Sequence, residues 1–161
     1  TLNCSCLFLL NGEDTKLKVK NGKFKSGSDR DFVEFKLLQY CLKKKFPILG
    51  ICRGHQFINI YFEGKIKKIN NHVNKNHKIK IIDQSIKEKL KLNYMVVNSF
   101  HNFGIYRDDL SKKLNPWAIK DDTVEGYYSK KYKILTMIWH PERRKIFNKN
   151  ELKLIKDLLT N

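Results

Sequence analysis

Cysteine is scarce in this sequence of 161 residues, with four cysteines at positions 4, 6, 41 and 52. They show neither the paired spacing of a metal site nor the density of a disulfide scaffold. This argues against a small disulfide-stapled secreted domain and predicts a reducing, cytoplasmic environment. For Cys4, Cys6 and Cys41 the simplest interpretation is that of small buried hydrophobic side chains.

Long hydrophobic runs are also lacking. The longest apolar stretch near the start covers residues 6–10, which is far too short to span a bilayer, and no basic leader precedes it. Hydrophobic residues make up 41% and charged residues 30%, a composition typical of soluble globular proteins. We therefore expect neither a membrane segment nor a secretion signal.

Acidic residues are few, 16 against 33 lysines and arginines, which gives a formal net charge of +17. Clustered basic side chains bind nucleic acid because they neutralise phosphates and release counterions. Here the lysines are scattered along the whole chain, without a zinc finger, an RNA-binding signature or a basic base-reading helix. We predict no nucleic-acid partner, and a solvated basic surface whose field favours an anionic small-molecule substrate.

The length predicts a single domain over residues 1–161, and the sequence contains no internal repeat. Short apolar runs alternate with apolar residues at helical spacing, which indicates an α/β sheet protein with ligands at the carboxyl ends of its strands. We expect strands at residues 6–10, 46–51, 94–97, 117–120, 124–128 and 133–139, extended chain at 65–83, a polar loop from 11 to about 28, and helices starting at Ser28 or Asp29, after Cys52 and at Glu151.

Residues 50–54, Gly-Ile-Cys-Arg-Gly, join an apolar strand to a helical pattern. This is the form of a nucleophile elbow with cysteine in place of serine. The glycines allow the sharp turn and keep side chains away from a nucleophile in a strained conformation. A helix N-terminus also favours thiolate over thiol, so we expect Cys52 to be a nucleophile with a lowered pKa.

The last expected strand ends in Trp139-His140-Pro141-Glu142. In extended chain alternate side chains point the same way, so Glu142 can lie beside His140 and hold one ring nitrogen while the other faces the sulfur. Cys52, His140 and Glu142 are therefore the predicted catalytic triad.

Five segments, in this order over about residues 7–145, resemble the class I glutamine amidotransferase-like superfamily and, within it, the γ-glutamyl hydrolase (peptidase C26-like) group. They are Leu9-Leu10-Asn11-Gly12, Pro47-Ile48-Leu49-Gly50-Ile51-Cys52-Arg53-Gly54-His55-Gln56, Val97-Asn98-Ser99-Phe100-His101, Val124-Glu125-Gly126 and Trp139-His140-Pro141-Glu142. The resemblance implies an α/β, flavodoxin-like three-layer sandwich with a mostly parallel central sheet and the active site at its carboxyl edge. It implies no metal and no other cofactor.

The resemblance also implies a reaction and roles for further residues. A thiolate attacks a γ-carboxamide carbon, His140 protonates the departing amine, and water hydrolyses the glutamyl thioester. The backbone amides of Gly12 and Arg53 would form the oxyanion hole.

The glutamyl amino and carboxylate groups would be held by Gln56 and by the segment Asn98, Ser99 and Phe100. His101 would shape this segment or be an ordinary hydrogen-bonded histidine.

Four more side chains are candidates for binding a metal ion or a phosphate. His72 and His77 could suggest a metal site, but similar histidines occur in relatives that use none. Arg143 and Arg144 follow the triad directly and could meet a phosphate on the substrate, or lie on a solvated turn.

The chain departs from the family pattern at two places. The family usually has a βαβ unit before the strand at residues 7–10, so we expect residues to be missing before Thr1. Asn11 stands where relatives often carry glycine, and Phe103 stands where polyamine-pathway relatives often carry glutamine, which weakens a polyamine role.

Three functions remain open. The chain looks most like the γ-glutamyl-CDP-amidate hydrolases of capsule polysaccharide biosynthesis, which would release glutamate and cytidine diphosphoramidate. The alternative is a glutaminase subunit that passes ammonia to a separate synthetase. A non-catalytic basic module that binds a polyanion is the third, and a homo-oligomer is compatible with all three.

Overall fold

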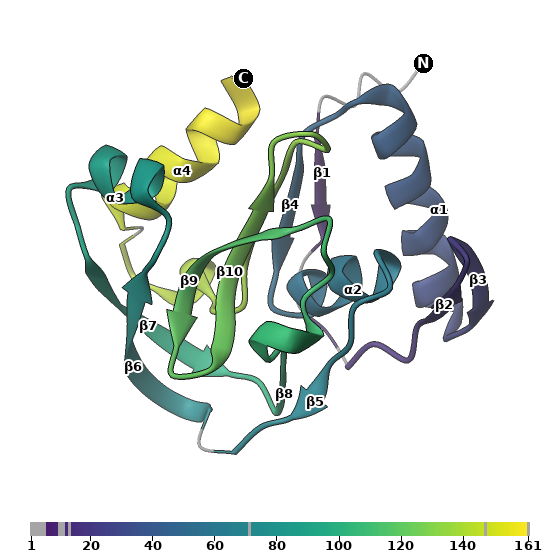
Figure 1. Ribbon diagram of the computed structural model, residues 1–161, viewed down its shortest axis with the longest axis horizontal. Helices are drawn as coiled ribbons and strands as arrows, with labels where there is room; N and C mark the ends of the chain where they lie inside the picture. The colour runs from purple at the N-terminus through teal and green to yellow at the C-terminus, as the bar shows by residue number, and fades with distance from the viewer. Residues whose placement is uncertain (1–5, 10–11, 13, 71, 147, 161) are drawn as a thin grey trace.

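The computed structural model describes residues 6–9, 12, 14–70, 72–146 and 148–160. Its centre is a seven-stranded sheet with helices on both faces (Figure 1). The strands of this sheet are β1 (Leu7–Leu9), β4 (Ile48–Ile51), β6 (Val73–Ile81), β7 (Tyr94–Phe100), β9 (Asn115–Lys120), β10 (Thr123–Ser129) and β11 (Ile134–Met137). The helices are α1 (Asp29–Lys44), α2 (Arg53–Tyr61), α3 (Gln84–Leu90) and α4 (Lys149–Thr160), with 3-10 turns η1 (Arg107–Asp109) and η2 (Pro141–Arg143). Two small sheets pair β2 (Lys18–Lys20) with β3 (Lys23–Ser26) and β5 (Lys67–Lys68) with β8 (Phe103–Gly104).

The main sheet has the strand order β1-β4-β11-β10-β9-β6-β7. Within the described residues β1, β4 and β11 run parallel, whereas the pairings β11–β10, β10–β9, β9–β6 and β6–β7 are antiparallel. The expectation of a mostly parallel central sheet is therefore wrong for this part of the chain. The physical reason is connection length. Only two residues separate β9 from β10 and four separate β10 from β11, too few for the crossover that parallel neighbours require.

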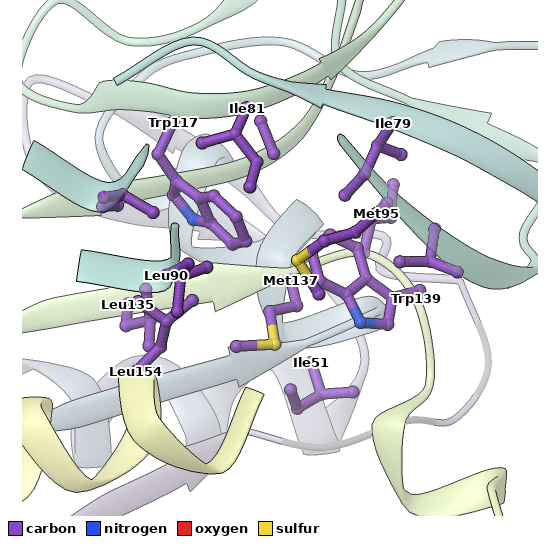
Figure 2. Packing of buried hydrophobic residues seen from close by; sticks show 14 of the residues in the cluster. Ile51, Ile79, Ile81, Leu90, Met95, Trp117, Leu135, Met137, Trp139 and Leu154 are labelled. Atoms are coloured by element: carbon purple, nitrogen blue, oxygen red, sulfur yellow. The ribbon is translucent and has the colours of Figure 1, made fainter. Parts of the chain in front are cut away.

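Each face of the sheet has its own hydrophobic core. Side chains of α1 and α2, among them Phe35 and Phe57, pack on one face. On the other face Leu90 of α3 and Leu154 of α4 belong to a cluster with Trp117 and Trp139 (Figure 2). Burial of such large apolar side chains is the main favourable term in folding. The layers thus follow the expected order of helix, sheet and helix.

Helix α1 begins as the sequence predicted. Ser28 is its N-cap, and a capping box joins the Ser28 and Asp31 side chains to each other's backbone amides. Lys43 and Lys44 lie in the last turn, where they complement the helix dipole.

Two elements of the structure, the hairpin β2–β3 and the helix α3, were not predicted from the sequence. The loop from 11 to about 28 contains the hairpin β2–β3, whose turn residues Asn21 and Gly22 both have positive φ. An Asn-Gly pair is a strong hairpin signal. The expected strand at 94–97 continues as β7 to Phe100, and α3 precedes it.

Among the described residues, no helix is both long enough and apolar enough to cross a bilayer.

Candidate active site

Cys52 lies in a sharp turn between β4 and α2, as predicted. Its backbone has φ 49° and ψ −99°, a left-handed conformation that is strained for a residue with a side chain. A side chain on Gly54 would collide with the Leu9 carbonyl, so the glycine lets β1 approach the start of α2. The Cys52 amide donates a hydrogen bond to the Met137 carbonyl over 2.9 Å, which joins the turn to the end of β11.

The thiol of Cys52 is buried, with 6% of the residue exposed. Burial raises its pKa to about 11, against the smaller lowering effects of the Arg53 backbone hydrogen bond and the Arg143 charge. The expected lowering of the Cys52 pKa by the helix N-terminus is therefore wrong in its net sign. Desolvation disfavours the thiolate more than the helix end stabilises it.

His140 and Glu142 form the predicted pair. The distance from His140 Nδ1 to Glu142 Oε1 is 2.6 Å, while His140 is fully buried and Glu142 is partly exposed. The expected extended geometry is wrong, because β11 ends at Met137 and Pro141 starts the 3-10 turn η2. Within the described part of the chain, His140 Nε2 is a buried atom with no hydrogen-bond partner. This nitrogen carries the lone pair when Nδ1 donates to Glu142.

Cys52 and His140 follow neighbouring parallel strands. Ile51, the last residue of β4, pairs with Met137, the last residue of β11. Cys52 and His140, which follow these strands, therefore lie at the same edge of the sheet. Glu142 acts electrostatically on the Cys52 thiol and raises its pKa, as does Asp14. The predicted triad thus belongs to one neighbourhood.

Asn98 holds the backbone of His140 instead of standing free in a cleft. Asn98 Nδ2 donates to the His140 carbonyl over 2.8 Å, and the His140 amide donates to Asn98 Oδ1 over 2.8 Å. The rings of Phe100 and His140 lie edge to face with centroids 5.8 Å apart, and the Arg143 guanidinium lies 4.4 Å from the Phe100 centroid. A cavity of about 430 Å³ opens beside these groups. Its lining consists of Asn76, Val96, Asn98, Phe100, Arg143 and Arg144.

Arg144 is less free than Arg143. Its Nη2 donates to the Val96 carbonyl over 2.7 Å and lies 3.6 Å from Glu151 Oε1. Arg143 therefore has the guanidinium better placed to meet an anion in this cavity.

The other predicted binding residues, Gln56, Ser99 and His101, do not line the cavity beside His140. Alternate side chains of a strand point to opposite faces, so Ser99 turns away from Asn98 and its hydroxyl donates to the His72 carbonyl. His101 Nδ1 lies 3.0 Å from the Phe103 carbonyl, which also accepts a hydrogen bond from Gln56 Nε2 over 3.0 Å. The structure does not bring the Ser99 side chain to His140.

The two backbone amides predicted to form the oxyanion hole, those of Arg53 and Gly12, have different surroundings. The Arg53 amide donates a hydrogen bond to the Cys52 sulfur. Gly12 is exposed, and a side chain there would occupy the position of the Arg30 guanidinium. The neighbouring motif residues Leu10 and Asn11 lie outside the described residues.

The role of the Arg53 side chain was not predicted from the sequence. Its Nη2 lies 2.6 Å from Asp31 Oδ1, its Nη1 contacts Glu34, and all three residues are buried. Burial alone would raise the pKa of Asp31, but hydrogen bonds from Thr15 and Ser28, with the Arg53 charge, lower it overall. Acidic residues on the otherwise apolar face of α1 were the available signal.

Among the residues that the structure describes, one buried group has side chains close enough to bind a metal ion: His72, His101 and Glu125. It lies apart from the triad, on β10 and next to the ends of β6 and β7.

The sheet, its helices and the turn at Cys52 have the α/β fold of the class I glutamine amidotransferases. The glutaminase domain of Trypanosoma brucei CTPS, solved with bound acivicin, matches with a TM-score of 0.72 and 17% identity, over 98% of this chain and 72% of that chain. At this identity the likeness shows the fold alone.

By sequence the chain belongs to the peptidase C26 family, which it matches over residues 14–142. It is 36% identical over 129 residues to γ-glutamyl-CDP-amidate hydrolase of Campylobacter jejuni, covering 80% of this chain and 58% of that protein. It is 32% identical over 143 residues to the carbamoyl phosphate synthase small chain of Pyrobaculum aerophilum, covering 87% of this chain and 36% of that protein. The chain thus spans 58% and 36% of the length of these two relatives.

Proposed function

We propose that this chain hydrolyses a γ-glutamyl amide bond through a thioester on Cys52. The observation that carries the proposal is the state of His140. Its Nδ1 is held by Glu142, its backbone is held by Asn98, and its buried Nε2 has no partner within the described residues. This is a positioned base at the sheet edge that also carries a cysteine in a strained turn.

The chemical steps follow from the protonation states. Because burial raises the pKa of Cys52 to about 11, the sulfur is a thiol at neutral pH. His140 Nε2 accepts the thiol proton as the sulfur attacks the carbonyl carbon, and the Arg53 amide, with Gly12 as second donor, stabilises the oxyanion. The imidazolium then gives its proton to the departing amine. His140 next takes a proton from water, which attacks the thioester carbon; the carbon–sulfur bond breaks, glutamate is released, and the imidazolium returns its proton to the Cys52 sulfur.

The leaving amine is proposed to carry negative charge. The cavity beside His140 is lined by Arg143 and Arg144, and the chain has a net charge of +17. An arginine fork matches a phosphate bidentately. Together with the similarity to the Campylobacter jejuni enzyme, this supports γ-glutamyl-CDP-amidate as substrate, with glutamate and cytidine diphosphoramidate as products in capsule biosynthesis.

The test is steady-state glutamate release from γ-glutamyl-CDP-amidate and from free glutamine. The full chain is compared with Cys52→Ala and with Cys41→Ala, a buried cysteine on α1 that serves as matched control. We expect a preference for the nucleotide, a loss of at least about three orders of magnitude in Cys52→Ala, and no comparable loss in Cys41→Ala. Equal losses in both variants would refute the role of Cys52.

An Arg143→Gln variant separates specificity from chemistry. We expect kcat/KM to fall more for the nucleotide than for glutamine, because only the nucleotide has phosphates to meet the guanidinium, whereas the effect of the Arg143 charge on the Cys52 thiol is common to both substrates. Poor turnover of both substrates by the unmodified chain would favour the second candidate, a glutaminase subunit that needs a synthetase. The similarity to a carbamoyl phosphate synthase small chain supports that alternative.

A further inference from the structure

Three histidines and one glutamate form a buried cluster between β6, β7 and β10. Glu125 comes from β10 and is 1% exposed, His77 lies on β6, His72 precedes β6 and His101 follows β7. His77 Nε2 lies 3.0 Å from Glu125 Oε2, and His72 Nδ1 lies 3.7 Å from Glu125 Oε1. The ring centroids of His72 and His101 are 5.1 Å apart.

The tautomer of the neutral His101 ring follows from its contact with a backbone carbonyl. His101 Nδ1 lies 3.0 Å from the Phe103 carbonyl, which can only accept, so Nδ1 is the donor. His101 Nε2 therefore has a free lone pair.

These nitrogens are not satisfied by protein atoms. Across the described ranges, His72 Nδ1 and His101 Nε2 are both buried without a hydrogen-bond partner. A buried polar atom in this state is destabilising, because it has lost its hydrogen bonds to water and gained none from the protein. Two such atoms beside one carboxylate indicate that a ligand binds between these side chains.

We propose that His72, His101 and Glu125 bind a zinc ion. Two imidazoles and a carboxylate are a known zinc ligand set, and one ligand atom from each residue lies within 4.8 Å of the others. Zinc–nitrogen distances of about 2.0–2.1 Å place tetrahedral ligands roughly 3.3 Å apart, so side-chain shifts of about an ångström close the site.

The surrounding contacts are those of a metal site. A ligating histidine usually donates its other nitrogen to a carbonyl or carboxylate, as His101 does to Phe103. A ligating carboxylate is usually hydrogen-bonded in turn, as Glu125 is to His77.

The ion would have a structural role and takes no part in the hydrolysis. It joins the start of β6, the end of β7 and β10. Glu125 also accepts, through its carbonyl, the Ile138 amide over 2.9 Å, two residues before His140. The site would thus fix the strand that carries Asn98 against the segment that carries His140.

The test is calorimetric titration of the chelator-treated full chain with Zn²⁺, in a Cys52→Ala background that removes the thiol as a competing ligand. We expect one ion per chain. Glu125→Gln and His101→Gln should each weaken binding at least 100-fold, because loss of an outer-shell partner already costs about 10–100-fold. His140→Gln is the matched control and should leave Zn²⁺ affinity unchanged.

Co²⁺ provides a readout that does not depend on the variants folding. In the Cys52→Ala chain it should give the visible absorption bands of a tetrahedral nitrogen and oxygen site, displaced by one equivalent of Zn²⁺. Absence of these bands, or Zn²⁺ binding that survives in Glu125→Gln and disappears in His140→Gln, would overturn the proposal. The cluster would then be a hydrogen-bonded network only.

Discussion

The two halves of the main sheet contribute differently to the candidate site. The parallel half, β1-β4-β11 with α1 and α2, supplies the groups proposed to react, Cys52 and His140. The antiparallel half, β10-β9-β6-β7, supplies Asn98 and Phe100, which contact His140. The difference shows that the reacting side chains are placed by local turns, whereas their orientation depends on contacts across more than 40 residues of chain.

Charge is also used differently in the two halves. Next to the parallel half, Arg53 is buried between Asp31 and Glu34. Next to the antiparallel half, Arg107 of η1 pairs with Asp122 over 3.8 Å with both side chains exposed. The first arrangement removes charges from water and so depends on every partner being present, while the second does not.

The largest expected effect tests this contrast. Arg53→Met should lower the free energy of unfolding by about 3–5 kcal/mol, because it leaves buried carboxylates uncompensated. The matched change Arg107→Met should cost less than about 1 kcal/mol. Urea denaturation of both variants measures the difference. Similar small losses would mean that water screens Asp31 and Glu34 in solution.

A smaller effect tests the link between the halves. Asn98→Ala removes both hydrogen bonds to the His140 backbone, each buried bond being worth about 1–3 kcal/mol when a partner is left unpaired. We expect kcat to fall about 10–100-fold with a smaller change in KM. A residue that only held the glutamyl group would instead raise KM.

The control is Asn76→Ala. Asn76 lies opposite Asn98 in the β6–β7 register and lines the same cavity. Its kcat should stay within about threefold of the parent value, because surface-type changes are usually worth less than about 0.5 kcal/mol. Equal losses in both variants would show that the cavity, and not the grip on His140, decides the rate.

The sequence predicted the parallel half well because its signals are local. Ser28, one of the two expected helix starts, caps α1, and the glycines that permit the turn lie two residues before and two residues after Cys52. The strands at β4 and β11 followed from short apolar runs. The association of His140 with Glu142 was also predicted, though through an extended geometry that the 3-10 turn replaces.

The antiparallel half was harder to predict because its determinants are distant in sequence. No local pattern says that Asn98 turns to His140 while Ser99 turns to His72. The register between β6 and β7 decides which side chains share a face. The net pKa of Cys52 was missed for a related reason, since burial depends on packing from the whole molecule whereas the helix end is local.

The last and smallest expected effect concerns the protonation state of the Cys52 thiol in the free protein. It tests whether His140, the other reacting group of the parallel half, takes the thiol proton before a substrate binds. With a Cys52 pKa of about 11, only the thiolate fraction reacts with iodoacetamide, so the alkylation rate should rise about tenfold per pH unit between pH 6.5 and 8.5. Peptide mass spectrometry resolves Cys52 from Cys41 and measures this slope. His140→Ala should leave the slope unchanged if His140 acts as a base only during attack on the substrate. A rate that stays flat over this pH range in the parent chain, and becomes steep in His140→Ala, would mean that a resident thiolate–imidazolium pair exists, and the proton transfer proposed above would then precede substrate binding.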